Sequence, residues 1–366
     1  MKEKAKAKEI LQKIIPFLGI ILMIIIFQVG GEGKLLTKGN INSILNQTVY
    51  IAIMAFGAIF VYSHGGMDLS YGGVIGFSVL VAILVANTGV PAGVVFITNI
   101  LAALVWFVLN GVVSVYLQVS PFITSLCIMY MCRGILNTVC ASQKYSIPVE
   151  LFEFDNQKFK LGMLLCMVYE TLSNLASISW VTAINGEITT LGRFPYCLII
   201  FAIMFVLFYI IFNYTKFGYN VRACASSQRI AKNSGVNTKK TAFLCYVVSS
   251  LFLGVAALLK ISIQGSIDTP MYMSSTNIIF NCMLGIYVGL ALEQYCNLVI
   301  GIFIGNFILN MLTTGLLSMG LSASLQDTAS GIFLLVIMIF TYNNQRVMNF
   351  ISEQKLKKEL VRTNTQ

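Results

Sequence analysis

One carboxylate, Asp68, lies in the glycine-rich stretch HGGMDLSYGGVIGFS, which begins at His64 within an otherwise almost charge-free part of the chain. Two kinds of chemistry suit an acid in this place. As a helix cap, it can accept hydrogen bonds from the free N–H groups at a helix start, where the helix dipole also favours negative charge. Alternatively, it contacts a solute or relays protons, because ionisable groups in strongly apolar segments are functional by default. The neighbouring glycines allow sharp turns and close helix approach, which favours the cap.

Uncharged polar side chains in other apolar runs form a second group of candidates. Amide groups occur there at Asn99, Asn110, Asn306 and Asn310. They can bind a polar solute or form hydrogen bonds between helices, and we favour the packing role. An aromatic ring can in turn stack on one face of a solute. The candidates for a gate or pathway are therefore Asp68, Ser70, Asn110, Phe122 and Asn310.

Several catalytic and metal chemistries are excluded by counting. The chain has one histidine, and its nine cysteines form no CxxC pair. Neither a multi-histidine site nor a cysteine metal site is therefore indicated. The sequence G-x-x-x-x-G-K-[ST], which binds nucleotide phosphates, does not occur. The scattered carboxylates make no recognisable enzyme constellation, so we predict no catalytic residue, no metal and no cofactor.

The elements that must position these residues are membrane helices. Hydrophobic residues make up 57% of the 366 residues, charged residues only 10%, and the mean hydropathy is +0.82. A soluble domain would carry about a quarter charged residues. A helix needs about 20 apolar residues to cross the bilayer, so the charge-free runs predict an all-α integral membrane protein with about ten transmembrane helices. The predicted spans are 14–31, 43–63, 69–87, 92–116, 121–140, 195–214, 242–262, 276–292, 296–317 and 325–343.

Lysine and arginine predict the orientation, because cytoplasmic loops of membrane proteins are enriched in them. Most of the 24 basic residues lie in the leader 1–13, the loop 215–240 and the tail 344–366. An even number of spans places all three in the cytoplasm and the segment 141–194 outside. The net charge of +10 is therefore topogenic and does not indicate nucleic-acid binding. We read 14–31 as an uncleaved span rather than a signal peptide, because it lacks a small-residue cleavage site.

The outer segment 141–194 is the one long connection between predicted spans. It holds an apolar stretch, 161–180, that Glu170 interrupts. We expect an amphipathic or partly embedded helix there. An extra span would instead place the basic loop 215–240 outside, against the charge rule.

An internal repeat is also indicated. Sliding the sequence by 200 positions brings Asp68 over Asp268 and Asn110 over Asn310. The seventh predicted span comes five spans after the second. Spans 2–5 and 7–10 would therefore be two four-helix repeats that run in opposite senses across the membrane. Inverted repeats of this kind are common in transporters.

Four stretches of the chain together resemble one family. They are GGMDLSYGGVIGFSVLVAILVA, NGVVSVYLQVSPFITSLCIMYMCRGI, TKFGYNVRACASSQRIAKNSGVNTKKTAFLCYVVSSLFLGVAALL and NMLTTGLLSMGLSASLQDTASGIFLLVIMI. In this order they are similar to the permease subunits of bacterial ABC importers of the ribose/galactose/xylose (monosaccharide) type, over about residues 40–343. The chain departs from that family at NCMLGIYVGLALEQYCN, where a Gly-Gly-Thr-Ser-rich turn is usual, and in the greater length of 141–194. The solute therefore stays open among a pentose, a hexose, a nucleoside and a furanosyl signalling molecule.

The resemblance implies a single transmembrane permease domain over 1–366, in a bacterial cell membrane, with both termini in the cytoplasm. The implied partners are an ABC ATPase subunit, a second permease chain that is a copy or a paralogue, and an extracellular solute-binding protein. The alternative is an ion-coupled secondary transporter, with Asp68, Glu293 or Asp327 as the ion-linked carboxylate.

A permease of this kind needs a cytoplasmic element that docks in a groove of its ATPase, and the resemblance points to 215–240. There, NVRACASSQRIAKNSG can form a short helix that Gly235 ends as a left-handed cap. A plain cytoplasmic loop explains the basic charges, which could meet acidic ATPase surface or lipid phosphates, but it does not explain the helical length. Cys224 is the expected site for thiol labelling of this loop. The expected coupling residues are Gly218, Arg222, Arg229, Lys232, Ser234 and Gly235.

Overall fold

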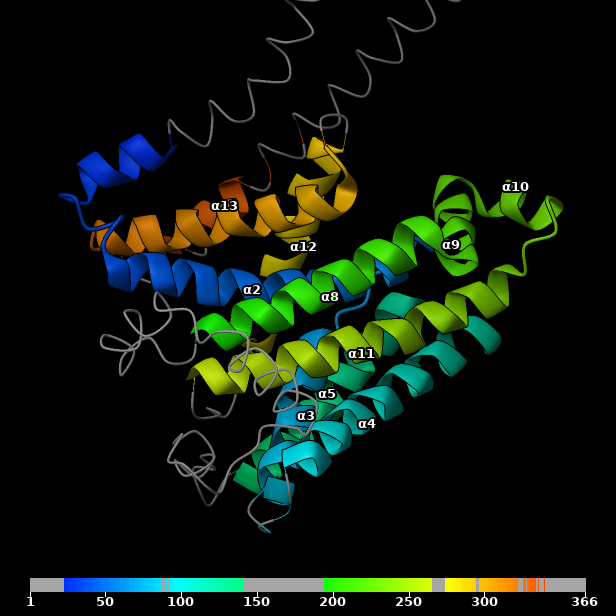
Figure 1. Cartoon of the computed structure of the whole chain (residues 1–366). Coiled ribbons are helices and arrows are strands. Elements are labelled where there is room, and N and C mark those ends of the chain that lie inside the picture. The colour runs from blue at the N-terminus through cyan, green and yellow to red at the C-terminus, as the bar shows by residue number, and fades with distance from the viewer. Residues whose placement is uncertain are drawn as a thin grey trace, which may run out of the picture. The chain divides into compact units, whose positions relative to one another are not determined.

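The computed structural model of the chain describes residues 23–86, 88, 90, 92–140, 194–264, 274–293, 296–321, 325, 326, 328–333, 335 and 339. The predicted leader, tail and nearly all of the outer segment 141–194 lie outside these residues. All regular structure within the described ranges is helical, as the sequence predicts (Figure 1). The chain divides into two compact units: unit 1 is Met1–Ile44 with Leu284–Gln366, and unit 2 is Leu45–Met283.

Unit 2 is a bundle of mostly apolar helices. The elements of unit 2 are α2 (Lys38–Tyr62, which starts in unit 1), α3 (Tyr71–Ala86), α4 (Ala92–Gly111), the π-helical turn η1 (Val112–Tyr116), α5 (Pro121–Cys140), α8 (Phe194–Tyr214), α9 (Lys216–Ser226), α10 (Gln228–Asn233), α11 (Thr238–Gln264) and the first half of α12 (Ser274–Leu292). α11 packs against α3 and α4, and α3 also packs against α4 and α5. α8 leads into α9 through a bend of 69°.

Aromatic rings join α2, α8 and α11 within this unit. Phe56 of α2 stacks on Phe208 of α8 with ring centroids 4.7 Å apart, and Phe60 meets the same ring edge-on at 5.4 Å. Phe252 of α11 lies against both Phe60 and Phe208. All four side chains are fully buried. Each such aromatic pair adds about 0.5–1.5 kcal/mol to the burial of its area, so these helices form one packed group.

One end of unit 2 gathers three connections that the sequence predicts on the same side of the membrane. Gln228, at the start of α10, donates a hydrogen bond from Nε2 to the carbonyl of His64 in the α2–α3 connection, at 2.6 Å. The Ser125 hydroxyl near the start of α5 donates to the carbonyl of Met67, at 3.4 Å. At the other end, Ala86 and Val95 share a cluster with Leu258. Within unit 2 these contacts agree with the predicted order of helix ends, while the orientation in a membrane stays a prediction.

Unit 1 is built on a close crossing of α12 and α13 (Leu298–Ser318). A Cβ on Gly289 of α12 would lie 2.7 Å from the backbone nitrogen of Ile302, and a Cβ on Gly301 of α13 would lie 2.8 Å from the carbonyl of Gly289. Small residues four apart, here also Gly285 and Gly305, allow such contact between membrane helices. The two backbones therefore touch directly.

Helices coincide, within five residues at either end, with every predicted span from 43–63 to 296–317. Five of them, or six if α8 and α9 form one bent span, are long and apolar enough to cross a membrane, while α3 and Ile278–Leu292 are shorter apolar helices. The total of ten spans and the inverted repeats stay predictions. Two findings differ from the prediction of one short helix in the loop 215–240. The loop holds two short helices, and α11 begins inside it, at Thr238.

Candidate functional site

Asp68 lies at the centre of a buried polar cluster in unit 2. Its side chain is 0% exposed. One carboxylate oxygen, Oδ1, accepts hydrogen bonds from the backbone N–H of Ser70 at 2.8 Å and from the Ser70 hydroxyl at 2.6 Å. The other, Oδ2, accepts a hydrogen bond from Nδ2 of Asn110, at 2.9 Å. The structure thus brings together three of the five residues that the sequence proposes for a gate or pathway.

The predicted hydrogen bond from a backbone N–H at the start of the third span to the Asp68 carboxylate is present, with a difference in position. The N–H of Val74 bonds to the carbonyl of Ser70 at 2.9 Å, so Ser70 is the residue that caps α3. Asp68 accepts from the N–H of that capping residue, one step before the helix. Gly65, with φ of +73°, makes the turn that leads into this arrangement.

The sequence did not predict the hydrogen bond that Asn110 donates to the Asp68 carboxylate. Asn110 is the penultimate residue of α4, and its Oδ1 accepts a hydrogen bond from the hydroxyl of Ser114 in η1, at 3.1 Å. Close by, the hydroxyls of Tyr71 on α3 and Ser249 on α11 are hydrogen-bonded to each other. A buried polar group is costly unless it is paired, so these bonds join the start of α3 to the end of α4 and, through Tyr71 and Ser249, to the middle of α11.

The end of α4 is irregular beside this cluster. Residues Val112–Tyr116 form a π-helical turn, in which the N–H of Leu117 reaches the carbonyl of Val112 at 3.2 Å. Gln118 follows with φ of +58°, a left-handed conformation that is uncommon for a residue other than glycine. π-turns are frequent at functional sites. The polar cluster therefore adjoins a segment whose backbone departs from regular helix.

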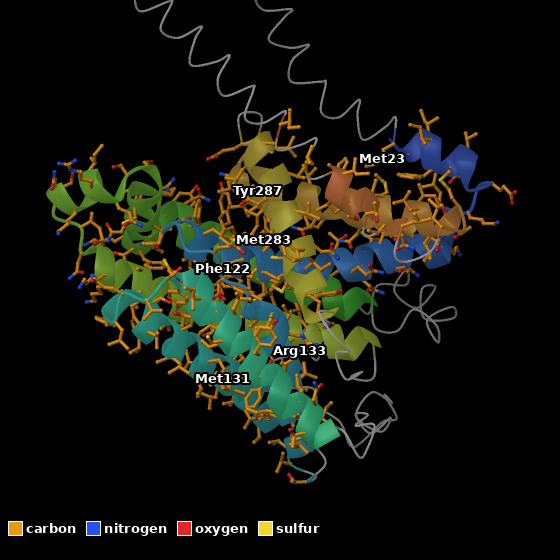
Figure 2. The ribbon with its side chains drawn as sticks, turned by 180° about the vertical axis from the view of Figure 1, so that it is seen from behind. Met23, Phe122, Met131, Arg133, Met283 and Tyr287 are labelled. Atoms are coloured by element: carbon orange, nitrogen blue, oxygen red, sulfur yellow. The ribbon has the colours of Figure 1, made fainter. Side chains whose placement is uncertain are left out.

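The two remaining pathway candidates lie elsewhere. Phe122 lies near the start of α5 (Figure 2) and is 43% exposed, whereas Asp68 and Asn110 are fully buried. Asn310 lies on α13 in unit 1, where its Nδ2 donates to the carbonyl of Asn306 at 2.9 Å. The asparagines at 99 and 306 likewise donate to backbone carbonyls, those of Gly254 and Ile302. Only the Asn99 bond, from α4 to Gly254 on α11, joins two helices as the favoured packing role requires, whereas the bonds of Asn306 and Asn310 lie within α13.

The corner between α8 and α9 depends on Gly218. The Thr215 hydroxyl caps α9 by accepting a hydrogen bond from the N–H of Gly218 at 3.1 Å. A Cβ on Gly218 would collide with the carbonyl oxygens of Ile211 and Phe212 at the end of α8. Only glycine therefore fits where the chain folds back on itself.

Arg222 faces inward, unlike the outward position expected of a residue that meets a partner. Its guanidinium carbon lies 4.7 Å from the ring centre of Tyr219 and 5.8 Å from that of Phe212. Nη2 donates to the carbonyl of Asn213 at 3.4 Å. A cation near the C-terminus of a helix is stabilised by the helix dipole and the free carbonyls there. In this structure Arg222 braces the α8–α9 corner.

The remaining coupling candidates lie on or just after α10, and all of them are exposed: Arg229, Lys232, Ser234 and Gly235. Gly235 has φ of +86°, and the N–H groups of Gly235 and Val236 bond to the carbonyls of Lys232 and Ala231. This is the left-handed cap that the sequence predicts. Ile230 also lies outward, with 67% of its side chain exposed, and adds an apolar contact to this surface.

Cys224 does not suit the labelling role expected of it. Only 2% of its side chain is exposed. Burial also raises the pKa of its thiol above the usual range, which lowers the fraction of reactive thiolate. The neighbouring Ser226 is exposed and offers a better position for a reporter cysteine.

Gln228 is a residue that sequence reasoning missed. Its hydrogen bond to the carbonyl of His64 joins residues 164 positions apart. No local sequence signal points to it, because the acceptor is a backbone carbonyl and any residue type could supply it. The bond links the two short helices to the connection that holds Asp68.

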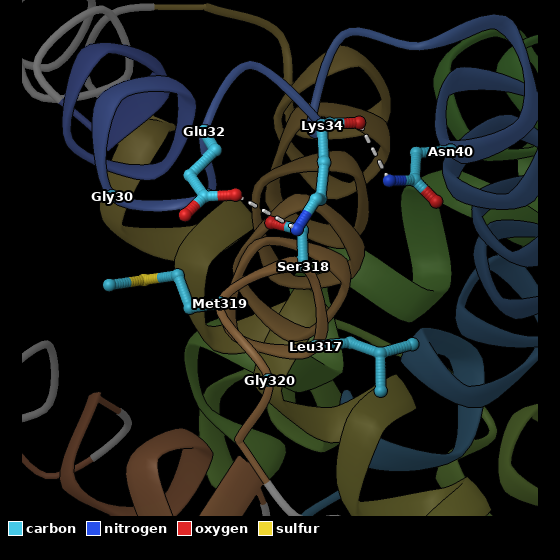
Figure 3. Close-up of a pocket in the computed structure, with 9 residues that line it drawn as sticks. Gly30, Glu32, Lys34, Asn40, Leu317, Ser318, Met319 and Gly320 are labelled. Carbon is cyan, nitrogen blue, oxygen red and sulfur yellow. Dashed lines mark hydrogen bonds and ion pairs between the residues drawn. The ribbon is translucent and has the colours of Figure 1, made fainter.

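Among the described residues, no group of three or more His, Cys, Asp and Glu side chains could hold a metal ion. Of the carboxylates proposed for an ion-coupled carrier, Glu293 is exposed just after α12, and Asp327 lies outside the described residues. Unit 1 also has a cavity of about 420 Å³ between the connection before α2 and the end of α13 (Figure 3). Its polar groups bond to one another: Lys34 pairs with Glu32 at 3.2 Å, and Asn40 donates to the carbonyl of Lys34 at 2.7 Å.

Comparison with known proteins places the chain among permeases. Residues 40–342 match the family described as "Branched-chain amino acid transport system / permease component". The chain is 27% identical to the galactose/methyl galactoside import permease protein MglC of Salmonella typhimurium, over 85% of this chain and 88% of that protein. It is 24% identical to the ribose import permease protein RbsC of Bacillus subtilis, over 90% and 92% of the two chains. The same identity, 24%, relates it to the fructose import permease protein FruG of Bifidobacterium longum, over 73% of each chain.

No solved structure matches the chain. The proteins that it resembles are transport components and not enzymes. The family match covers most of the residues that carry the apolar helices, in agreement with an integral membrane protein. The chain therefore belongs to the family of branched-chain amino acid transport system permease components, and its predicted kinship with monosaccharide ABC import permeases is confirmed.

Proposed function

We propose that this chain forms the membrane pathway of an ABC importer for a monosaccharide or a related small polar solute. The family match over residues 40–342 carries the proposal, together with relatives named as galactose, ribose and fructose import permeases. The solute reaches the pathway from an extracellular binding protein, as the family resemblance implies. The pathway spans a bacterial cell membrane as one permease domain, with both termini in the cytoplasm.

The energy comes from a separate ABC ATPase, since the sequence lacks a phosphate-binding loop of its own. The docking surface for that ATPase consists of three exposed side chains of α10: the apolar Ile230 and the cations Arg229 and Lys232. Gly218 and Arg222 serve the same purpose indirectly, because they set the angle at which α9 and α10 leave α8. Gly235 ends the docking helix.

A complex of two permease chains, two ATPase domains and one binding protein is the assembly that we expect. The second permease chain is either a copy of this one or a paralogue. The polar cluster around Asp68 lies at the same end of unit 2 as α10, so we assign it to the cytoplasmic gate, together with Ser70 and Asn110. Phe122 and Asn310 stay candidates for the pathway.

Reconstitution tests this function directly. The chain, its cognate ATPase and its binding protein are placed in liposomes, and uptake of labelled ribose, xylose, galactose, fructose and a nucleoside is measured with ATP and with a non-hydrolysable analogue. We expect uptake of at least one solute that requires both ATP hydrolysis and the binding protein. Uptake that survives without ATP but collapses with an ionophore would instead identify an ion-coupled carrier.

Docking is tested by paired substitutions. Ile230→Asp and Arg229→Ala should weaken capture of the ATPase by the permease, while Lys240→Ala, an exposed basic change outside α10, should leave it unchanged. Equal capture by all three variants would remove α10 from the docking surface.

A further inference from the structure

The hydrogen bond between Gln228 and His64 connects α10, the proposed ATPase docking helix, to the α2–α3 connection that holds Asp68. Gln228 is the first residue of α10, directly after Ser227, whose hydroxyl caps that helix by accepting from the N–H of Ile230. The Gln228 amide reaches the His64 carbonyl at 2.6 Å. A displacement of α10 therefore pulls on the α2–α3 connection at a defined atom.

His64 begins a short tether that leads to Asp68. The tether starts from α2, since the N–H of His64 bonds to the carbonyl of Val61 at 3.1 Å. Two glycines follow, and Gly65 adopts the left-handed conformation with φ of +73°. A backbone of this kind can change direction without steric penalty. The tether is thus built to bend between an anchor on α2 and a carboxylate that reaches across to α4.

The carboxylate at the far end of the tether bridges two helices. Through Ser70 it holds the start of α3, and through Asn110 it holds the end of α4 at 2.9 Å. Directly after Asn110 come the π-helical turn and the left-handed Gln118. A π-turn can revert to α-helix, and positions of uncommon backbone conformation are typical of switch regions. The Asp68–Asn110 bond therefore sits where a small displacement can be converted into a new helix register.

We propose that Gln228 is a positioning residue that transmits the movement of α10, through the His64 carbonyl, to the Asp68–Asn110 hydrogen bond, which acts as a latch on the end of α4. This inference rests on the proposed importer function. The latch is closed in the present arrangement, with both carboxylate oxygens satisfied. Movement of α10 driven by the ATPase opens it and releases the segment from Asn110 to Gln118.

The central test is Gln228→Glu in the reconstituted complex. Glutamate keeps the length of the side chain but, when ionised, has no N–H to donate, so it cannot bond to a carbonyl. Loss of one such bond corresponds to about 0.5–1.5 kcal/mol, and we expect solute uptake per ATP hydrolysed to fall about 2- to 10-fold while ATPase capture and basal ATP hydrolysis stay at the parent level. Asn237→Asp makes the same chemical change at an exposed position outside α10, keeps the oxygen that accepts from the N–H of Lys240, and should have no effect.

A second substitution distinguishes transmission through the latch from a local effect. In an Asp68→Asn background the latch is already weakened, so adding Gln228→Glu should lower coupling no further, because two changes in one chain of contacts are not additive. Gln228→Lys, which retains N–H donors, should restore coupling toward the parent value.

Each result bears on the proposal. Parental uptake per ATP in Gln228→Glu, or full additivity with Asp68→Asn, would overturn the latch mechanism while leaving the importer function in place. Loss of ATPase capture in Gln228→Glu would also overturn it, by making Gln228 part of the docking surface. Failure of the parent complex to show ATP-dependent uptake would instead overturn the proposed function itself.

Discussion

Removing the Asp68 carboxylate tests the buried cluster most directly. Asp68→Ala deletes the acceptor for three donors: the N–H and hydroxyl of Ser70 and the Nδ2 of Asn110. The hydroxyl can rotate toward another acceptor, so two buried donors lose their partner. A buried donor left unsatisfied costs about 1–3 kcal/mol. We therefore expect Asp68→Ala to lower the free energy of unfolding by about 2–6 kcal/mol.

Two further variants show whether the bond to Asn110 contributes as the geometry requires. Asp68→Asn keeps an oxygen for Ser70 but turns an amide toward the amide of Asn110, so about half of the loss is expected. The double variant Asp68→Asn with Asn110→Asp restores a donor and an acceptor across the same 2.9 Å contact, with donor and acceptor exchanged. It should be more stable than Asp68→Asn alone.

The chain carries its own reporters of unfolding. Cys132, Cys245 and Cys282 are at most 1% exposed, so a thiol-reactive dye reaches them only when the helices separate. The exposed Cys127 reacts before unfolding and sets a constant baseline. Variants are heated in detergent at one rate, because membrane proteins often unfold irreversibly. An unchanged midpoint in Asp68→Ala, or no gain in the double variant over Asp68→Asn, would refute the account of this cluster.

Three other expectations follow from the packing. Gly218→Ala drives a methyl group into the carbonyls at the end of α8 and should lower stability by about 1–3 kcal/mol, whereas Gly134→Ala, which meets nothing within 4 Å, should not destabilise. Gly289→Ala places its methyl 2.7 Å from the backbone of Ile302 and should cost about 1–3 kcal/mol in thermal unfolding; a parental midpoint would contradict the α12–α13 crossing. An impermeant thiol reagent should label Ser226→Cys quickly in inside-out vesicles and slowly in intact cells. It should label Cys224 slowly in both. Because burial raises the pKa of the Cys224 thiol, its labelling rate should keep increasing with pH above the usual titration range of a cysteine. Fast labelling of Ser226→Cys in intact cells would reverse the proposed orientation.

Local sequence was sufficient to locate the helices. Charge-free runs near the length of a membrane span predicted helix positions well, because a backbone in hydrocarbon has to satisfy its own hydrogen bonds. The start of α5 at Pro121 and the left-handed Gly235 after α10 are equally local, since ring geometry and the absence of a Cβ act on one or two residues. The break of the basic segment into α9 and α10 was missed, because the cap at Ser227 resembles an ordinary serine in a helix.

The partners of the polar residues were beyond the sequence. Runs such as α3 are apolar on every side, so no amphipathic pattern indicates which face meets another helix and which meets lipid. The inward position of Arg222 and the burial of Cys224 follow from how α9 folds back on α8, which depends on a corner around Gly218.

What the amino-acid order determined by itself is a membrane-embedded set of helices, its turns and one isolated acid near the start of α3. What only the tertiary structure decided is that this acid meets Asn110, 42 residues away, and that Gln228 meets His64, 164 residues away. The physical reason is range: helix formation and capping act within a few residues, whereas these two bonds exist only because packing brings distant helix ends together.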